Sequence, residues 1–421
     1  MATSADFDLL ATDGHARLGR IKASLNTPAV LLYTRRGFPP PLTPREVKSL
    51  YQSGASPSTF AFFMSAADFY DDPGSGVLSS FRGVREFCGL QDQKEMIVVG
   101  NKDAVNQQFG MPSSDTWVTL QTSAGQKKVA NEDYIKLLSA MQPDIAVSLV
   151  DEVQMENSDK RIKKSVDRTL KWLDEYLAER KGGNVAESVT IFAAVVGGTS
   201  HRERERYARE LAKREVGGYA FTGFGTGESE EEREAFVRMS LEHLDQHKPR
   251  MMSGLGSPDE ILWSVKMGMD VLESAYPWFL SSQGLAISFP VSYEGIMKYA
   301  DEEEMEAESS LMNGKINLWD TDYCKNTDPI TKGCSCFACA KYSRAYIHHL
   351  LKTNEMLAEA RPFFSVKHRM TSQQVFLSCH NQHCLLIFME SVRQSIADQS
   401  FEKFCTAFRK ARKAPSRFLQ G

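Results

Sequence analysis

Short, nearly continuous apolar runs recur along the first two thirds of the chain. Such runs are typical of parallel strands that are covered on both faces, because neither side of the strand meets water. Their β-branched and aromatic content favours strands over helices at these lengths. The runs that we interpret as strands cover residues 29–33, 60–64, 96–100, 144–150, 189–196, 218–223, 250–255 and 269–274.

Amphipathic helical stretches lie between several of these runs. The clearest begins after Ser158, a suitable N-cap, and ends at Gly182 and Gly183, which commonly stop a helix. Within it Ile162, Val166, Leu170, Leu173 and Leu177 recur at intervals of three and four residues. Helices are also predicted over 201–215, 228–247 and 257–268.

Alternating strands and helices predict an α/β protein, and eight strands predict a (β/α)8 barrel. The alternative is an open, doubly wound sheet. The glycine-rich "GFGTGE" (223–228) follows the sixth run rather than opening a first βα unit, which argues against a dinucleotide site. We expect the barrel to occupy residues 1–300, a cysteine-rich, zinc-binding subdomain 301–400, and a basic C-terminal tail 401–421.

Composition narrows the functional classes. The 421 residues carry a net charge of −4, which argues against a broadly basic nucleic-acid coat but allows a local basic patch. No run of 18 apolar residues is present, so no membrane span is expected. The N-terminus has no apolar segment of the secretory kind, so we expect a cytoplasmic protein.

Cysteines gather in the last quarter of the chain. Cys334, Cys336 and Cys339 form a C-x-C-x2-C pattern, which brings three thiolates within reach of one ion. Zinc prefers four ligands, so one ligand must come from outside the three cysteines. A site with four protein ligands has no open position for a substrate, which indicates a structural role. From the residues alone the candidates are Cys324, His348, His349, His368, Cys379, His380, His383 and Cys384.

The stretch "CSCFACAKYSRAYIHHLLKTNEML" (334–357) resembles the zinc segment of the queuine tRNA-ribosyltransferases, or tRNA-guanine transglycosylases. Residues 217–233 and 248–274 are similar to two further segments of that family. Residues 26–43 look more like its accessory subunit than its catalytic one. The resemblance implies a (β/α)8 barrel with an inserted zinc subdomain, and exchange of guanine for queuine at the wobble position of tRNA.

The resemblance also identifies the positions at which the family performs its chemistry. The nucleophilic aspartate corresponds to Glu273, one methylene longer, and the base-reading glutamine corresponds to Val196. The acid/base aspartate falls in "VVGNKDAV", where Asp103 lies nearby without the family's neighbouring residues. The base-reading aspartate is kept as Asp151, but the cysteine beside it is Val153.

These departures imply a non-catalytic accessory subunit in which Asp151 and Glu273 are vestigial. One alternative is an active transglycosylase that uses Glu273 as its nucleophile. Another is a barrel that no longer acts on tRNA and binds a different partner or ligand.

The resemblance selects one of the candidate metal ligands. The family's histidine spacing would fall on Ser365, but the local match to its His-Asn helix is "VFLSCHNQHCLLIFMESVR", which supplies His380. Residues 361–374 are then interpreted as an insertion. We expect one structural zinc per chain on Cys334, Cys336, Cys339 and His380, with His368, Cys379 and His383 as rivals.

The partners that the resemblance implies are a catalytic subunit, in a heterodimer, and tRNA held through that complex. A homodimer is the alternative assembly when the partner is absent. The family also suggests a cytoplasmic location, with association at the mitochondrial outer membrane through a partner. The candidate phosphate contacts are Lys341, Arg344, Arg409, Lys410, Arg412 and Lys413, although ordinary solvated cations explain them equally well.

Overall fold

The structure is a computed structural model, which describes residues 7–52, 60–91, 94–105, 113–154, 157–302, 314–353 and 372–413. The chain divides into two compact units. Unit 1 comprises residues 1–38 and 60–274, and unit 2 comprises residues 39–59 and 275–421. The subdomain boundaries at 300 and 400 that we expect from the sequence stay a prediction.

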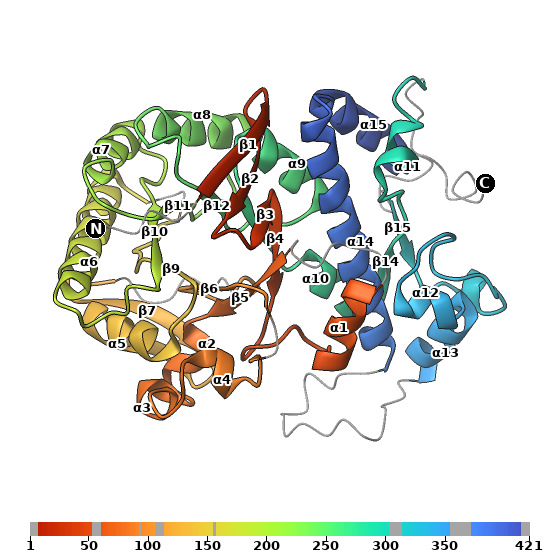
Figure 1. The fold of residues 1–421 in the computed structure, drawn as a ribbon, viewed down its shortest axis with the longest axis horizontal. Helices are drawn as coiled ribbons and strands as arrows, with labels where there is room; N and C mark the ends of the chain where they lie inside the picture. The colour runs from red at the N-terminus through yellow and green to blue at the C-terminus, as the bar shows by residue number, and fades with distance from the viewer. Residues whose placement is uncertain are drawn as a thin grey trace. The chain divides into compact units, whose positions relative to one another are not determined.

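Unit 1 is built on a closed barrel of eight parallel strands, in the order β10-β11-β12-β13-β4-β5-β6-β9 (Figure 1). The barrel closes between β13 and β4, where Glu273 lies opposite Leu31. Each predicted apolar run supplies one strand, so the barrel is confirmed and the open sheet is wrong. The strands are β4 (Ala29–Tyr33), β5 (Phe60–Ser65), β6 (Ile97–Gly100), β9 (Ile145–Val147), β10 (Thr190–Val195), β11 (Gly218–Phe221), β12 (Arg250–Met252) and β13 (Val271–Ser274).

Helices surround the barrel on its outer face, and the four predicted from the sequence are present. Ser158 is the N-cap residue of the first, and Ser257 forms a reciprocal capping box with Glu260 at the start of the last. The helices of unit 1 are α2 (Ala67–Tyr70), α3 (Gly74–Leu78), α4 (Val84–Phe87), α5 (Asn131–Met141), α6 (Asp159–Lys181), α7 (His201–Leu211), α8 (Glu230–Leu241) and α9 (Pro258–Lys266).

Two antiparallel elements of unit 1 are not predicted from the sequence. One is a three-stranded sheet of β1 (Phe7–Asp13), β2 (Ala16–Ile21) and β3 (Leu25–Thr27). The other is a hairpin of β7 (Trp117–Thr122) and β8 (Gly125–Ala130). Both contain a largely solvent-facing strand, so their sequences lack the continuous apolar run that marks a barrel strand.

Unit 2 is organised around the 26-residue helix α14 (Ser372–Ala397). Asn381 fastens this helix to a small sheet, because its side chain accepts from the Ile287 amide at 2.9 Å and donates to the Leu285 carbonyl at 3.0 Å. In the described part of the chain no helix, α14 included, is long and apolar enough to cross a membrane. The other elements are α1 (Pro44–Gln52), α10 (Tyr276–Ser282), β14 (Leu285–Ile287), α11 (Tyr293–Met297), β15 (Lys315–Asn317), η1 (Thr321–Tyr323), α12 (Phe337–Lys341), α13 (Arg344–Thr353) and α15 (Phe401–Lys413).

The segment expected as a basic tail begins as helix α15. Phe404 and Phe408 on its inner face are buried, and their rings lie 6.2 and 4.9 Å from that of Phe388 on α14. Basic residues occupy the last turn of the helix, where they complement its dipole. Residues 414–421, and nearly all of the predicted insertion at 361–374, lie outside the described residues.

The turn after β10 depends on a glycine. Gly197 has a φ of 144°, and a Cβ there would lie 2.7 Å from the Cα of Arg204 and closer still to its Cγ. Arg204 is fully buried between the rings of Phe224 and Phe236, at 5.1 and 4.5 Å from their centroids. The arginine therefore cannot move aside to admit a side chain without breaking this packing.

We expect Gly197→Ala to lower the free energy of unfolding by roughly 3 kcal/mol or more, because it combines backbone strain with a clash in the core. Gly183→Ala is the matched control: its φ is +81°, with no atom within 4 Å of the added Cβ, so only about 1 kcal/mol should be lost. Urea denaturation of the three proteins measures both values. Equal losses of unfolding free energy in the two variants would show that contact with Arg204 does not exclude a side chain at position 197.

Candidate barrel-mouth site and metal centre

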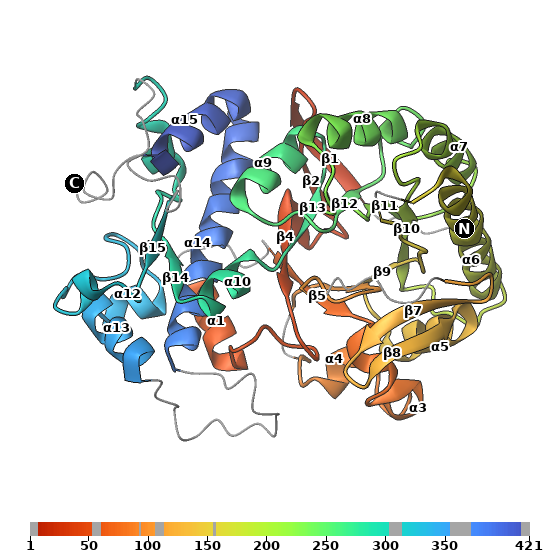
Figure 2. The ribbon, with the colours of Figure 1, turned by 180° about the vertical axis from the view of Figure 1, so that it is seen from behind.

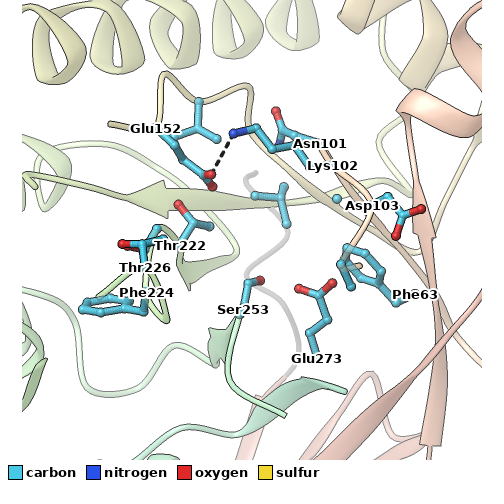
Figure 3. Close-up of a pocket in the computed structure, with 16 residues that line it drawn as sticks. Phe63, Asn101, Lys102, Asp103, Glu152, Thr222, Phe224, Thr226, Ser253 and Glu273 are labelled. Carbon is cyan, nitrogen blue, oxygen red and sulfur yellow. Dashed lines mark hydrogen bonds and ion pairs between the residues drawn. The ribbon is translucent and has the colours of Figure 1, made fainter. Parts of the chain in front are cut away.

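A small cavity opens where the barrel strands end. Its volume is about 50 Å³, and its lining includes Lys102, Glu152, Ser253 and Glu273. Figure 3 shows Lys102 and Glu152 joined across one side, where their charged ends lie 2.9 Å apart. This volume is far below the ~300 Å³ at the lower end of small-molecule sites, so a purine does not fit without rearrangement.

Glu273, at the predicted nucleophile position on β13, points its carboxyl into this cavity (Figure 3). The side chain is 6% exposed, and among the described residues its Oε1 has no hydrogen-bond partner. Burial raises the pKa of Glu273 to about 8; a hydrogen bond with Ser253 opposes the shift, while the charges of Asp103 and Glu152 add to it. At neutral pH the carboxyl is therefore mostly protonated, and a protonated carboxyl is a poor nucleophile.

Asp151, which the sequence predicts at the base-reading position, lies outside the cavity. It is fully buried and does not belong to the cavity lining. Arg161 pairs with both of its carboxylate oxygens, at 2.7 and 2.6 Å, and Arg168 donates to one of them at 3.2 Å. With two guanidinium groups on it, the carboxylate has little capacity left to accept bonds from a nucleobase.

The two remaining family positions also fall around the mouth. Asp103 belongs to the cavity lining, but one of its oxygens accepts from the Tyr33 hydroxyl at 3.2 Å and the other from the Val105 amide at 2.8 Å. Val196 is buried at the end of β10, outside the lining. Neither residue presents an uncommitted polar group to the cavity.

Sequence reasoning missed the two arginines that occupy Asp151. They lie ten and seventeen residues after it, on helix α6. The seven-residue interval places Arg161 and Arg168 on one face of a helix, which is a visible signal. Their pairing with the buried Asp151 cannot be predicted from the sequence, because it depends on how α6 packs against the end of β9.

We expect Glu273→Gln to change the pH dependence of stability. The folded pKa of about 8 lies above the unfolded value of ~4.3, so the wild-type chain loses stability as pH rises between these values. The glutamine variant cannot ionise, so it should gain a few kcal/mol relative to wild type by pH 8 and almost nothing at pH 4.5.

Urea denaturation at several pH values measures this difference. Glu132→Gln, which removes an exposed glutamate on α5, is the control and should show no such trend. If the free energies of unfolding of the wild type and of Glu273→Gln changed in parallel from pH 5 to 8, Glu273 would be ionised in the folded state.

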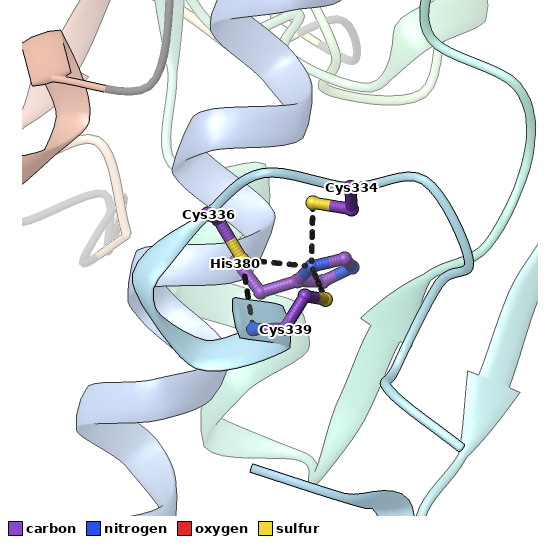
Figure 4. A group of neighbouring side chains, drawn as sticks. All are labelled: Cys334, Cys336, Cys339 and His380. Atoms are coloured by element: carbon purple, nitrogen blue, oxygen red, sulfur yellow. Dashed lines mark hydrogen bonds between the residues drawn. The ribbon is translucent and has the colours of Figure 1, made fainter. Parts of the chain in front are cut away.

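The second site lies in unit 2, where Cys334, Cys336, Cys339 and His380 converge (Figure 4). The cysteines lie on the turn that leads into α12. Cys336 is the N-cap residue, and its Sγ accepts from the Cys339 amide at 3.3 Å. This bond fixes the spacing of two thiols, because the helix start sets both positions. His380 approaches from the middle of α14 rather than from its first turn.

The four potential ligand atoms all lie within 4.8 Å of one another, and the nitrogen–sulfur separations among them match a tetrahedral site. The Nδ1 atom of His380 lies 3.7, 3.5 and 3.4 Å from the Sγ atoms of Cys334, Cys336 and Cys339. Bonds of ~2.3 Å to sulfur and ~2.0 Å to nitrogen at tetrahedral angles place sulfur and nitrogen roughly 3.6 Å apart. The cluster can therefore hold one metal ion with little movement.

The backbone prepares His380 for this role. Its Nε2 lies 2.8 Å from the Ile287 carbonyl oxygen. A carbonyl oxygen only accepts hydrogen bonds, so Nε2 must carry the proton. The Nδ1 lone pair is then directed at the three sulfurs, as in metal sites where a second hydrogen bond orients the ligand. Asn381, the next residue, holds the same strand, so one dipeptide positions both the ligand and its support.

Thiol electrostatics also favour a cation. Hydrogen bonds from the thiols of Cys336 and Cys339 hold the pKa of Cys334 well below its usual range. The contact with Cys334, followed by that with Cys339 and by burial, raises the pKa of Cys336. One thiolate therefore forms at the expense of the next, and three can coexist only beside a positive ion.

The rival ligands lie outside this group of four. His348 points its Nδ1 at the Leu318 carbonyl, 2.9 Å away, and burial raises the pKa of Cys379 to about 12. Cys384 lies one turn after His380, with its Sγ 3.5 Å from Nε2 and 3.8 Å from Nδ1, so it adjoins the group of four without belonging to it. His383 is buried, Cys324 is exposed, and His368 falls outside the described residues. Which side chains bind a metal stays a prediction.

We expect Cys339→Ser to lose the metal and several kcal/mol of stability in unit 2, because the binding free energy of a structural ion contributes to folding. Metal analysis on the purified protein and thermal unfolding measure the two effects. Cys324→Ser, which changes an exposed cysteine outside the cluster, should retain both metal and stability. Full metal occupancy in Cys339→Ser would contradict the assignment.

Comparison with known proteins relates both sites to one family. The family model described as queuine tRNA-ribosyltransferase matches residues 12–414. A Danio rerio protein named queuine tRNA-ribosyltransferase accessory subunit 2 is 31% identical over 406 residues, which cover 90% of this chain and 91% of that protein. Proteins of the same name from Xenopus tropicalis and Homo sapiens are each 30% identical; the matches cover 94% and 81% of this chain and 97% and 88% of those proteins.

Proposed function

Because the chain belongs to the queuine tRNA-ribosyltransferase family, we propose that it is a non-catalytic accessory subunit of the heterodimeric enzyme. In this role it supports the exchange of guanine for queuine at the anticodon wobble position of tRNA, while a catalytic subunit performs the chemistry. The names of the relatives from three vertebrates support the accessory assignment.

The state of Glu273 carries the non-catalytic part of the proposal. Base exchange requires an ionised carboxylate that can reach the ribose, and a space for the base beside it. Here the carboxyl at that position is 6% exposed, its pKa is raised to about 8 by burial, and its cavity measures about 50 Å³. Each property opposes the reaction, and together they leave no nucleophile poised for it.

The Asp151 cluster supports the same conclusion. The family's base-reading aspartate is present, but Arg161 and Arg168 use its oxygens for an internal ion pair. Breaking such a buried pair leaves an uncompensated charge, which typically costs ~3–5 kcal/mol. The aspartate is therefore committed to holding α6 against the barrel.

We further propose that unit 2 holds one structural zinc ion on Cys334, Cys336, Cys339 and His380. Three thiolates and an imidazole are typical of structural zinc sites, and four protein ligands leave no open position for a substrate. When bound, the ion supplies the positive charge that allows all three thiols to ionise.

The proposed partners are a catalytic subunit and, through the heterodimer, tRNA. Self-association is the alternative assembly when the catalytic subunit is absent. We propose a cytoplasmic location, with any association at the mitochondrial outer membrane mediated by a partner. Among the described residues there is no membrane-spanning helix that would anchor the chain directly.

One observation favours a second candidate function. Glu273 keeps a carboxyl at the nucleophile position and directs an unpartnered oxygen into the cavity, so an active enzyme that uses this residue is the alternative. Opening of the mouth and ionisation of Glu273 on tRNA binding would both be required for it.

The deciding experiment is incorporation of labelled guanine or queuine into tRNA by the purified chain, by a catalytic subunit, and by the mixture. We expect exchange only in the mixture, and Glu273→Gln should leave the mixture's rate within about twofold because the residue performs no chemistry. Exchange by the chain alone that Glu273→Gln abolishes would establish the alternative. A mixture no faster than its catalytic subunit alone would refute the accessory role.

A further inference from the structure

An uncompensated basic surface borders the barrel mouth. It consists of Lys160, Lys163 and Lys164 on α6 and Arg202 on α7, which we call the α6–α7 rim. All four side chains are exposed, and in the described part of the chain none makes an ion pair. Lys164 is attracted to Asp115, but that carboxylate is already bound by Arg168 at 2.7 Å.

Most other cations on these two helices are neutralised nearby. Ion pairs join Arg206 to Asp167, Arg209 to Glu205 and Lys171 to Glu175, at 2.7, 2.5 and 3.7 Å. Just beyond the end of α7, Lys213 pairs with Glu210 at 2.7 Å. Three exposed carboxylates lie beside the rim lysines in the described part of the chain. Asp115 is bound by Arg168 and Asp167 by Arg206, so Asp159 alone is left to offset a single charge. The rim therefore retains a net positive charge that the rest of the two helices does not share.

The two helices begin side by side at the mouth. Figures 1 and 2 show α6 and α7 as neighbours on the outside of the barrel, in both views. At their starts, a Cβ on Gly198 would lie 3.0 Å from the Ile162 side chain, and further along Arg206 binds Asp167. Arg161, next to Lys160, binds Asp151, and the following residue, Glu152, lines the cavity.

The structure also weakens several phosphate contacts expected from the sequence. Lys341 lies over the Phe337 ring at 4.9 Å, and Arg344 donates to the Ile330 carbonyl at 2.9 Å. Lys410 donates to two backbone carbonyls, and Arg412 lies over the Phe408 ring at 5.5 Å. These side chains have internal contacts, whereas the rim side chains form no hydrogen bond or ion pair with any described residue.

Helix stability does not explain the rim lysines. They lie in the first two turns of α6, where the helix dipole is positive and cations are unfavourable. Lys160 and Lys164 are one turn apart on the same face, with Lys163 beside them, so their charges repel one another. An extended anion bound along these lysines would offset both the helix dipole and the mutual repulsion, because it places several negative charges beside them.

We propose that the α6–α7 rim binds the phosphate backbone of an RNA. This inference rests on the proposed function, which supplies tRNA as the RNA, and it assigns the contact to a specific surface of this subunit. The contact carries no base specificity, because exposed lysines recognise phosphate as a charge. The rim would therefore position the RNA while the catalytic subunit selects and exchanges the base.

The test compares two charge-matched double variants in complex with a catalytic subunit. Lys164→Gln/Arg202→Gln removes two rim charges. Lys181→Gln/Lys213→Gln removes one charge at the far end of α6 and one just beyond the far end of α7. For the rim variant we expect the affinity for tRNA at 0.1 M salt to fall about tenfold. The slope of log affinity against log salt should fall by about 1 to 2, with little change in the control.

Other outcomes would overturn the inference. Equal tRNA affinities and salt slopes for the two variants, while the wild-type mixture still exchanges guanine, would refute the rim alone and leave the accessory role intact. A rim variant that no longer assembles with the catalytic subunit would make the rim a protein interface. Loss of binding to phosphatidylserine vesicles with unchanged tRNA binding would make it a lipid-headgroup surface.

Discussion

A carboxylate buried inside a folded chain must either pair with a positive charge or lose its own charge by protonation. This constraint determines the state of the carboxyl groups in the barrel. Asp151 follows the first course, with two arginines on its carboxylate. Glu273 follows the second, because nothing positive among the described residues contacts it and burial keeps its proton in place. The two carboxyls are thereby limited in opposite ways, Asp151 by its ion pairs and Glu273 by its retained proton.

The same constraint organises unit 2, with a different solution. Three thiols that share one small space cannot all ionise unless a cation joins them. The surrounding structure is arranged for that event: Cys336 begins α12, while Ile287 fixes the tautomer of His380 and Asn381 holds the strand that carries Ile287. An arrangement this complete in its supporting contacts is typical of a structural site, where orientation matters more than an exchangeable position.

The sequence predicts the elements that have a periodic apolar pattern, and it misses the features that depend on tertiary packing. All eight barrel strands follow from continuous apolar runs, since a strand buried on both faces has no polar alternation to confuse the pattern. Helix α6 follows equally well from its apolar spacing. The sheet β1–β3 and the hairpin β7–β8 are missed because each contains a largely solvent-facing strand, which has no continuous apolar run. The crowding of cysteines predicts a group of potential metal ligands, but sequence distance alone does not choose among the histidines, since α14 reaches the group only after the chain folds back.

The pairing of charges has a further consequence for the barrel's outer surface. Arg161 and Arg168 lie on α6 among other cations, and both turn inward to neutralise Asp151. Their inward orientation removes two positive charges from the mouth. Lys160, Lys163, Lys164 and Arg202 remain at its edge, with no ion pair to any residue that the structure describes. A chain with a net charge of −4 does not require them for solubility. A subunit that holds a polyanion for another subunit to modify needs exposed cations that no internal partner neutralises, and it needs no reactive carboxylate of its own.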